Sequence, residues 1–173
     1  MPTPAPRFVH RNLPLMLLQV RERLMSKFRP LLKAHGLTEQ QWRVLRTLND
    51  HEFLEPREIG EICCISSPSM AGMLARMEEL GLVDRERFEN DQRRVRVSLT
   101  AKARDIVTKV APLNEKSYRA IEEELGADTV EALYAVLDEM LQTLGPSPVD
   151  SDWPAGKSGS RLTHRGQWGS WGK

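Results

Sequence analysis

Apolar residues recur every three or four positions over most of the chain, which predicts a mainly helical protein. The spacing predicts a first helix over residues 13–34, and Gly36 is a suitable end for it. Thr38 is followed three positions later by Gln41, which is the pattern of a capping box. We therefore expect a second helix from Thr38 to about Asn49.

A helix-turn-helix is predicted by the next two segments. A short helix should follow Pro56 and end near Cys63, and another should begin at Ser66-Ser67-Pro68, with Ser67 as its cap, and end near Gly81. One face of the later helix is apolar and is formed by Met70, Leu74 and Met77. The other face is small, polar and basic and is formed by Ser69, Gly72 and Arg76.

After Gly81 the period of the pattern changes to two, which is typical of a β-strand. Val95, Val97 and Leu99 alternate with polar residues, and the turn-forming residues 89–92 precede them. These features predict a β-hairpin with an arginine-rich tip. A helix with an exposed polar and basic face, followed by a basic hairpin, is typical of a winged helix-turn-helix.

Two long helices should complete the chain. Thr100 is a suitable cap for the first, Pro112 predicts a kink or local break within it, and Gly126 ends it. Asp128 is expected to cap the last helix, whose apolar stripe extends to Leu144. The terminal helices, residues 12–35 and 101–145, have more apolar surface than one small winged domain can cover. This surplus favours a homodimer.

The expected organisation is a single domain over residues 12–145, with the winged helix-turn-helix at 38–100. Residues 1–11 are rich in proline and are expected to form a flexible arm. Residues 146–173 are rich in proline, glycine and serine and are expected to form a disordered tail.

Composition narrows the function further. The formal net charge of the 173 residues is only +1, so a nucleic-acid site must come from local clustering of charge. The segment from Arg85 to Arg96 supplies such a cluster, with five arginines against three carboxylates. The two cysteines are adjacent, which excludes an ordinary disulfide staple or a zinc quartet and fits a reducing cytoplasm. The sequence shows no phosphate loop, no nucleophile motif, no membrane span and no signal-peptide core, so we expect no enzyme, no cofactor, no metal and no membrane partner.

The segment from Asp91 to Thr100, DQRRVRVSLT, resembles the wing signature of the MarR family of bacterial regulators, an Asp-x-Arg element that ends in Leu-Thr. The resemblance extends over residues 13–144. Residues 40–45 and 63–72 are most similar to family members that repress the degradation of homoprotocatechuate (4-hydroxyphenylacetate). The resemblance implies a repressor that binds a pseudo-palindromic DNA operator as a homodimer and is released from it by a phenolic carboxylate.

Candidate DNA-binding residues lie on the predicted helix and on the hairpin. The helix start at Ser66 offers N–H groups and a positive dipole to a phosphate. Its exposed side chains suit phosphate or base edges, and Gly72 permits a close approach. The resemblance implies that Arg93 enters the minor groove and that Asp91 holds the wing in shape, while Arg94 suits a phosphate contact. The DNA-binding set is therefore Ser66, Ser67, Ser69, Gly72, Arg76, Asp91, Arg93 and Arg94. The plainer alternative is that Ser67 only caps the helix and Arg76 is a solvated charge.

The resemblance also implies an aromatic-acid site between the dimerisation helices and the winged domain. Arginine suits the carboxylate because its planar fork binds two oxygens at once. The candidate residues are Arg21, Trp42, Arg46, Met70 and His35. The alternatives are core packing for Trp42, an intersubunit ion pair for Arg21, and a bond to backbone carbonyls for His35.

Two other functions remain open. Cys63 or Cys64 would serve a redox-responsive regulator, but the peroxide-sensing branch of the family places its reactive cysteine on the first helix, and the nearest cation in sequence is Arg57. Buried packing is the simpler role for them. Alternatively, the apolar terminal helices would bind a protein partner in a module that never touches DNA. Loss of binding with rising salt would separate a DNA reader from that module.

Overall fold

The computed structural model describes residues 9–145, so the predicted tail and most of the predicted arm lie outside the described residues. This part of the chain forms six helices and one two-stranded antiparallel sheet, as the sequence predicts. In chain order the elements are α1 (Leu13–Ala34), α2 (Glu39–Asn49), α3 (Pro56–Cys63), α4 (Ser67–Glu79), β1 (Val83–Phe88), β2 (Asp91–Leu99), α5 (Ala101–Leu125) and α6 (Ala127–Leu144).

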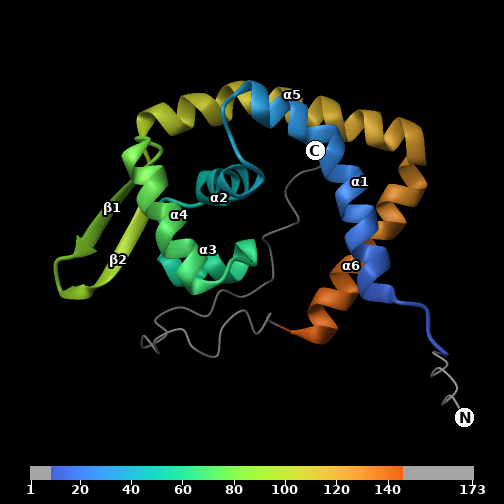
Figure 1. Cartoon of the computed structure of the whole chain (residues 1–173), viewed down its shortest axis with the longest axis horizontal. Helices are drawn as coiled ribbons and strands as arrows, with labels where there is room; N and C mark the ends of the chain where they lie inside the picture. The colour runs from blue at the N-terminus through green and yellow to red at the C-terminus, as the bar shows by residue number, and fades with distance from the viewer. Residues whose placement is uncertain (1–8, 146–173) are drawn as a thin grey trace, which may run out of the picture.

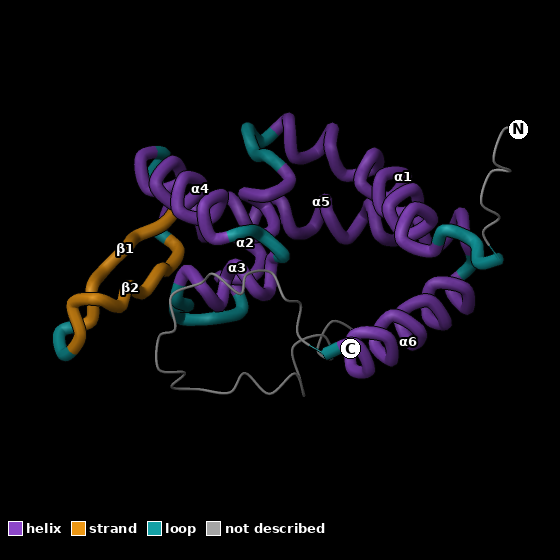
Figure 2. Tube along the Cα trace, turned by 60° about the horizontal axis from the view of Figure 1, so that its bottom comes forward, coloured by secondary structure: helices purple, strands orange, loops and turns teal. Residues whose placement is uncertain are grey.

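The long helix α5 runs along the molecule and connects its two ends (Figure 1). Helices α2, α3 and α4 lie together beside its first half, and the hairpin projects beyond them. Helix α6 turns back from the far end of α5, on the same side of the molecule as the start of α1 (Figure 2). The hairpin and α2–α4 therefore lie at one end, and α6 with the start of α1 lies at the other, while α5 and the end of α1 reach into the winged part.

The hydrophobic core lies in the winged part of the molecule. Its fully buried side chains come from the end of α1, from α2, α3 and α4, from the hairpin base and from the first half of α5, and include Leu32, Leu45, Ile59, Leu74, Val97 and Val110. Helix α6 has no buried residue, although its composition is apolar. One chain thus completes the core of its winged part and leaves α6 largely uncovered.

The helix starts confirm the predicted caps Thr38 and Thr100 and correct two others. Thr100 Oγ1 accepts the Ala103 N–H at 3.0 Å at the start of α5. Thr38 and Gln41 form the capping box: the Gln41 N–H donates to Thr38 Oγ1 at 3.1 Å, and the Thr38 N–H donates to Gln41 Oε1 at 2.9 Å. The cap of α4, however, is Ser66 and not Ser67, which is the first helical residue. The cap of α6 is Gly126, and Asp128 lies in its first turn. Ser67 and Asp128 are residue types that suit a cap, but both already lie inside their helices, which begin at Ser67 and at Ala127.

The hairpin has a tighter turn than the sequence predicts. Strand β2 already begins at Asp91, so Asp91 and Gln92 belong to the strand and only residues 89 and 90 connect it to β1. Val97 and Leu99 face the core, in agreement with the predicted alternation. Val83 pairs with Leu99 at the base of the hairpin, which therefore anchors the sheet to the helices.

A kink or local break was predicted at Pro112, and of these the break is absent, because α5 is continuous from Ala101 to Leu125. Proline removes one N–H donor, which would otherwise bond to the carbonyl of Thr108. Both residues lie on the exposed side of the helix, where water can satisfy that carbonyl. The helix is therefore able to continue through the proline.

Candidate nucleic-acid interface and effector site

Helix α4 separates its two faces as the sequence predicts. Met70, Leu74 and Met77 are at most 1% exposed and hold the helix on the core. Ser69, Gly72 and Arg76 are exposed. A side chain added at Gly72 would meet no protein atom within 4 Å, so a groove of DNA has open access to the backbone there.

The start of α4 is compact and polar. Ser66 Oγ donates to Ser69 Oγ at 3.0 Å, across the first turn of the helix. The first N–H groups of a helix have no acceptor within it, and the helix dipole places positive potential at this end. Arg76, three turns later, forms an exposed ion pair with Glu79 at 2.9 Å. Only the NH1 group of Arg76 is engaged in this pair, so its remaining N–H donors are available for a contact with DNA.

The hairpin tip is held by side-chain contacts to its own backbone. Asp91 Oδ1 accepts a hydrogen bond from the Arg93 N–H at 3.0 Å, and Gln92 Nε2 donates to the Phe88 carbonyl at 3.1 Å. The Arg93 residue itself is exposed. The position of Asp91 fits the role that the family resemblance implies for it, which is to shape the turn that presents Arg93.

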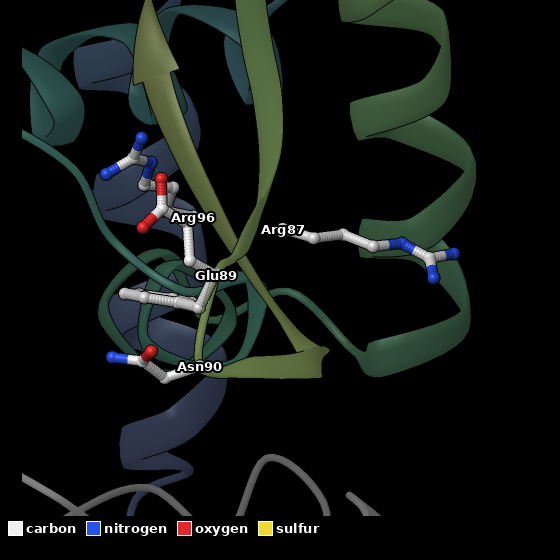
Figure 3. A pocket seen from close by; sticks show the side chains of 5 residues that line it. Arg87, Glu89, Asn90 and Arg96 are labelled. Carbon is white, nitrogen blue, oxygen red and sulfur yellow. The ribbon is translucent and has the colours of Figure 1, made fainter.

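A hollow of about 300 Å³ lies at this tip and is lined by Arg87, Phe88, Glu89, Asn90 and Arg96. Figure 3 shows Arg87 extending to one side of the hairpin, and Glu89 and Asn90 to the other. The hollow contains none of the residues predicted to bind an effector.

The arginines of the hairpin are not equally available to a ligand. Arg85 donates to Glu78 at 3.3 Å, Arg96 pairs with Glu86 on the neighbouring strand, and Arg94 pairs with Glu55, which precedes α3. The Glu55 carboxylate raises the pKa of Arg94 above its usual value. Three of the five arginines between residues 85 and 96 thus face a carboxylate.

Arg21, the predicted carboxylate ligand, is already bound to carboxylates of the same chain. It pairs with Glu22 and donates to Glu39 at 2.9 Å. Arg29 also contacts both acids, and its hydrogen bond lowers the pKa of Glu39 below the ordinary value. An ion-pair network therefore ties α1 to the start of α2, and the pairs that Arg21 forms here lie within one chain, whereas the alternative considered for it was an intersubunit pair.

Trp42 and Met70 belong to one buried hydrophobic cluster, and their residues are 7% and 0% exposed. Both are therefore integral to the core in this conformation. Met70 reaches that cluster from α4, the same helix that carries the exposed serine and arginine face.

Arg46 and His35 each have a partner of their own. Arg46 NH1 donates to the Tyr118 hydroxyl at 3.2 Å, and its guanidinium lies 5.7 Å from the centre of the Tyr118 ring. Tyr118 also packs on Phe28, with 4.9 Å between ring centres. His35 Nδ1 lies 2.9 Å from the Leu31 carbonyl, as the simpler interpretation of a helix-end histidine predicts.

The five predicted effector residues thus fall into separate groups within one chain. Glu39, Phe28 and Tyr118 are the partners that sequence reasoning missed. Glu39 directly follows the predicted cap Thr38, so its position at the start of α2 was predictable. Nothing in the local sequence pattern indicated that Arg21 and Arg29 of α1 would contact it.

The cysteines differ sharply in environment. Cys63 is buried, its Sγ lies 3.4 Å from Thr47 Oγ1, and burial raises the pKa of its thiol. Cys64 is exposed and has a left-handed backbone conformation with φ of 49°. The cation near Cys63 is Arg43, which donates to the Cys63 carbonyl at 2.5 Å, and not Arg57, the nearest in sequence. A raised pKa disfavours the thiolate of Cys63, which is the reactive form of a cysteine.

Within residues 9–145 the structure contains no helix that is both long and apolar enough to cross a membrane. In the same part of the chain, no three His, Cys, Asp or Glu side chains are grouped as a metal site would require.

The winged helix agrees with comparisons to known proteins. The model of the MarR family matches residues 37–95, which include α2, α3, α4 and most of the hairpin. A homoprotocatechuate degradative operon repressor of Escherichia coli is 39% identical over 133 residues, which are 77% of this chain and 90% of the relative. The chain belongs to the MarR family.

Two solved structures that are similar to this MarR family chain contain a bound molecule, an aromatic acid in one and DNA in the other. NadR in complex with 4-hydroxyphenylacetate is 38% identical, with a TM-score of 0.68, and the match covers 81% of this chain and 97% of NadR. The repressor CouR, bound to a 23-mer DNA duplex, is 27% identical, with a TM-score of 0.68, and the match covers 74% of this chain and 91% of CouR. The winged fold and its family are thus established.

Proposed function

We propose that the chain is a DNA-binding transcriptional repressor of an aromatic-acid catabolic operon, and not an enzyme. The observation that carries this proposal is the split of α4 into a buried face and an exposed face of Ser69, Gly72 and Arg76, beside a hairpin that presents Arg93. A helix of this kind fits the major groove, and an arginine at the tip of a hairpin fits the adjacent minor groove. The similarity to CouR, which was solved on DNA, supports the same use.

The active form is a homodimer on a pseudo-palindromic operator, with the two α4 helices in successive major grooves about 10 base pairs apart. The exposed apolar residues of α1 and α6, among them Leu17, Leu18, Val136 and Leu141, support this assembly. Such a surface is costly to expose to water, and a second copy offers the matching surface. The repressor would act in the cytoplasm, where its operator lies.

The effector is a small phenolic carboxylate such as homoprotocatechuate or 4-hydroxyphenylacetate, by similarity to the Escherichia coli repressor and to NadR. Arg21 is our candidate for the carboxylate, with Trp42, Arg46, Met70 and His35 around the ring. Because Arg21 bonds to Glu39 in this conformation, the effector carboxylate would take the place of Glu39. Release from DNA requires that the effector bind more tightly to a dimer whose two α4 helices are wrongly spaced.

A redox-responsive regulator is less well supported, since the pKa of the buried Cys63 thiol is raised. If a redox response existed, replacing both cysteines with serine would abolish it.

The test is a fluorescence-anisotropy titration of labelled DNA from the chain's own promoter region. We expect tight binding that weakens steeply with salt, because phosphate contacts release counterions. Homoprotocatechuate or 4-hydroxyphenylacetate at micromolar concentration should release the DNA, and phenylacetate, which differs from 4-hydroxyphenylacetate only in lacking the phenol hydroxyl, is the matched control. Absence of salt-dependent binding would favour the helical interaction module, whereas tight binding without release would reject the phenolic effector.

A further inference from the structure

The hairpin is attached to the helix-turn-helix by three consecutive residues of the loop between α2 and α3. Phe53 packs edge-on against Phe88 of β1, with 5.8 Å between ring centres. Leu54 forms a two-hydrogen-bond bridge with Val97 of β2, at 3.0 and 2.8 Å. Glu55 binds Arg94 of β2. We call this set of contacts the loop–hairpin contact.

The Glu55 side of this contact is well anchored. The N–H of Glu55 donates to Glu58 Oε2 at 2.8 Å, in the first turn of α3, so the residue is fixed at the helix start. Its carboxylate therefore has a defined position relative to α3 and α4. A carboxylate at a helix start also faces the positive end of the helix dipole.

Arg94 binds that carboxylate with two nitrogens. Its Nε lies 3.1 and 3.2 Å from the two Glu55 oxygens, and its NH2 also donates to Oε1. The guanidinium lies 4.7 Å from the centre of the Phe88 ring, where it gains a cation–π contact. One face of the guanidinium is thus against an aromatic ring and its Nε–NH2 edge is against an acid, so that edge is not available for a bidentate contact with a phosphate.

We propose that Arg94 is a positioning residue, which acts on DNA binding by fixing the hairpin to the start of α3 through Glu55. The proposal rests on the proposed DNA-binding function. DNA recognition by this fold requires that the tip and α4 reach adjacent grooves at the same time, and a hairpin that is free to move would lose binding entropy when it docks. The loop–hairpin contact removes that motion before DNA arrives.

The positioning role and a direct phosphate contact predict opposite changes in operator affinity for one variant, Glu55→Gln. If Arg94 binds phosphate, Glu55 competes with the DNA, and Glu55→Gln should strengthen operator binding. If Arg94 positions the hairpin, Glu55→Gln should weaken binding although it removes a negative charge near DNA. We expect a loss of about two- to fivefold, the scale of a half-exposed ion pair.

The matched control is Glu86→Gln. Glu86 pairs with Arg96 within the hairpin, so this variant removes the same charge from the same region without touching the loop between α2 and α3. Positioning predicts that Glu86→Gln binds DNA at least as well as the original chain. If both variants gain affinity, or if Glu55→Gln has no effect, the positioning role is wrong.

A charge-reversed pair gives an independent test. Arg94→Glu alone should bind DNA poorly under either role, and the double variant Glu55→Arg with Arg94→Glu should recover affinity only if the ion pair itself matters. A double variant as weak as Arg94→Glu would overturn the proposal. Circular dichroism should show folded protein for each, since both side chains are partly exposed.

Hydrogen exchange of the DNA-free protein separates this proposal from the proposed function. Glu55→Gln should speed amide exchange in β1 and β2, and leave α1 unchanged, whether or not the chain binds DNA. Faster exchange in a chain that binds no operator would retain the loop–hairpin contact and reject the repressor. Unchanged hairpin exchange would reject the contact as a constraint.

Discussion

Arg93 lies near the start of β2, and its backbone N–H donates to Asp91 Oδ1, which helps to fix its position at the hairpin tip. An arginine presented in this way gains most where the minor groove is narrow and its negative potential is high. Arg93 therefore combines a positive charge, an exposed side chain and a backbone held by a hydrogen bond. Arg94 and Arg96 differ because each is paired with a carboxylate.

Arg93→Ala should weaken operator binding by about 1–3 kcal/mol and leave the dimer intact. Anisotropy titration measures the affinity and sedimentation equilibrium measures the assembly. Lys27→Ala, which removes the same charge from α1, is the control and should bind DNA normally. Undiminished affinity of Arg93→Ala would remove the hairpin tip from the mechanism.

Met70 links the core to the proposed DNA-reading helix. Its residue is fully buried, so Met70→Ala should lower the free energy of unfolding by about 2–5 kcal/mol. Urea denaturation measures this loss, and Met73→Ala, on the same helix but only partly buried, should cost clearly less. Equal losses would show that Met70 is not held as tightly as its burial indicates.

Residue type and spacing were enough to predict which face of α4 is buried, because a 3.6-residue period decides it. They were not enough to assign Trp42, since an apolar position on a helix can face either a core or a ligand. The Glu55 partner of Arg94 was also beyond local reasoning, because 39 residues separate the two in sequence. Contacts of that kind depend on how the elements pack.

At the scale of elements, the predicted helices and the hairpin are confirmed, and the differences lie at their ends. Two adjacent serines have the same capping chemistry, so the sequence alone could not choose Ser66 over Ser67. Likewise Gly126 takes the cap of α6 because it already has a positive φ of 86°, which ends α5 and starts α6 at one residue. The break expected as one outcome at Pro112 is absent, because the carbonyl that the proline leaves without a donor is on the exposed side, where water can reach it.

The junction of α1 and α2 should respond to acid. Hydrogen bonding by Arg29 lowers the pKa of Glu39 from the ordinary value of 4.5, so the folded state favours the ionised carboxylate. Its contribution to stability is present above pH 4.5 and is lost as the pH falls further towards the lowered pKa of the folded state. The free energy of unfolding should therefore decline with acid in this range, and the decline should be shallower in Glu39→Gln.

Chemical denaturation between pH 3 and pH 6 measures this dependence. Glu89→Gln, at the exposed hairpin tip, is the control and should keep the original slope. If Glu39→Gln also keeps that slope, the ion-pair network between α1 and α2 does not contribute to folding.

At the scale of the whole molecule, the uncovered surface of α6 predicts the assembly. Leu141 is 57% exposed in one chain and lies on the apolar helix that has no buried residue. Leu141→Asp should therefore shift the protein to monomers in sedimentation equilibrium. Operator affinity should fall by more than about tenfold, because a monomer reaches only one half-site and loses the advantage of linked binding.

Gln142→Asp introduces the same charge at a neighbouring polar position of α6, and it should leave the dimer largely intact. A Leu141→Asp protein that remains dimeric would place the interface elsewhere.

The unbroken course of α5 has a mechanical consequence. Its 25 residues span about 37 Å as one rod, with the dimerising end and the DNA-reading end at its two extremes. A tilt of about 5° at one end displaces the other by about 3 Å, which is a substantial misfit against a groove repeat of about 34 Å. The helix therefore acts as a lever. A rearrangement too small to disturb the core changes the distance between the two α4 helices of the dimer by several ångströms.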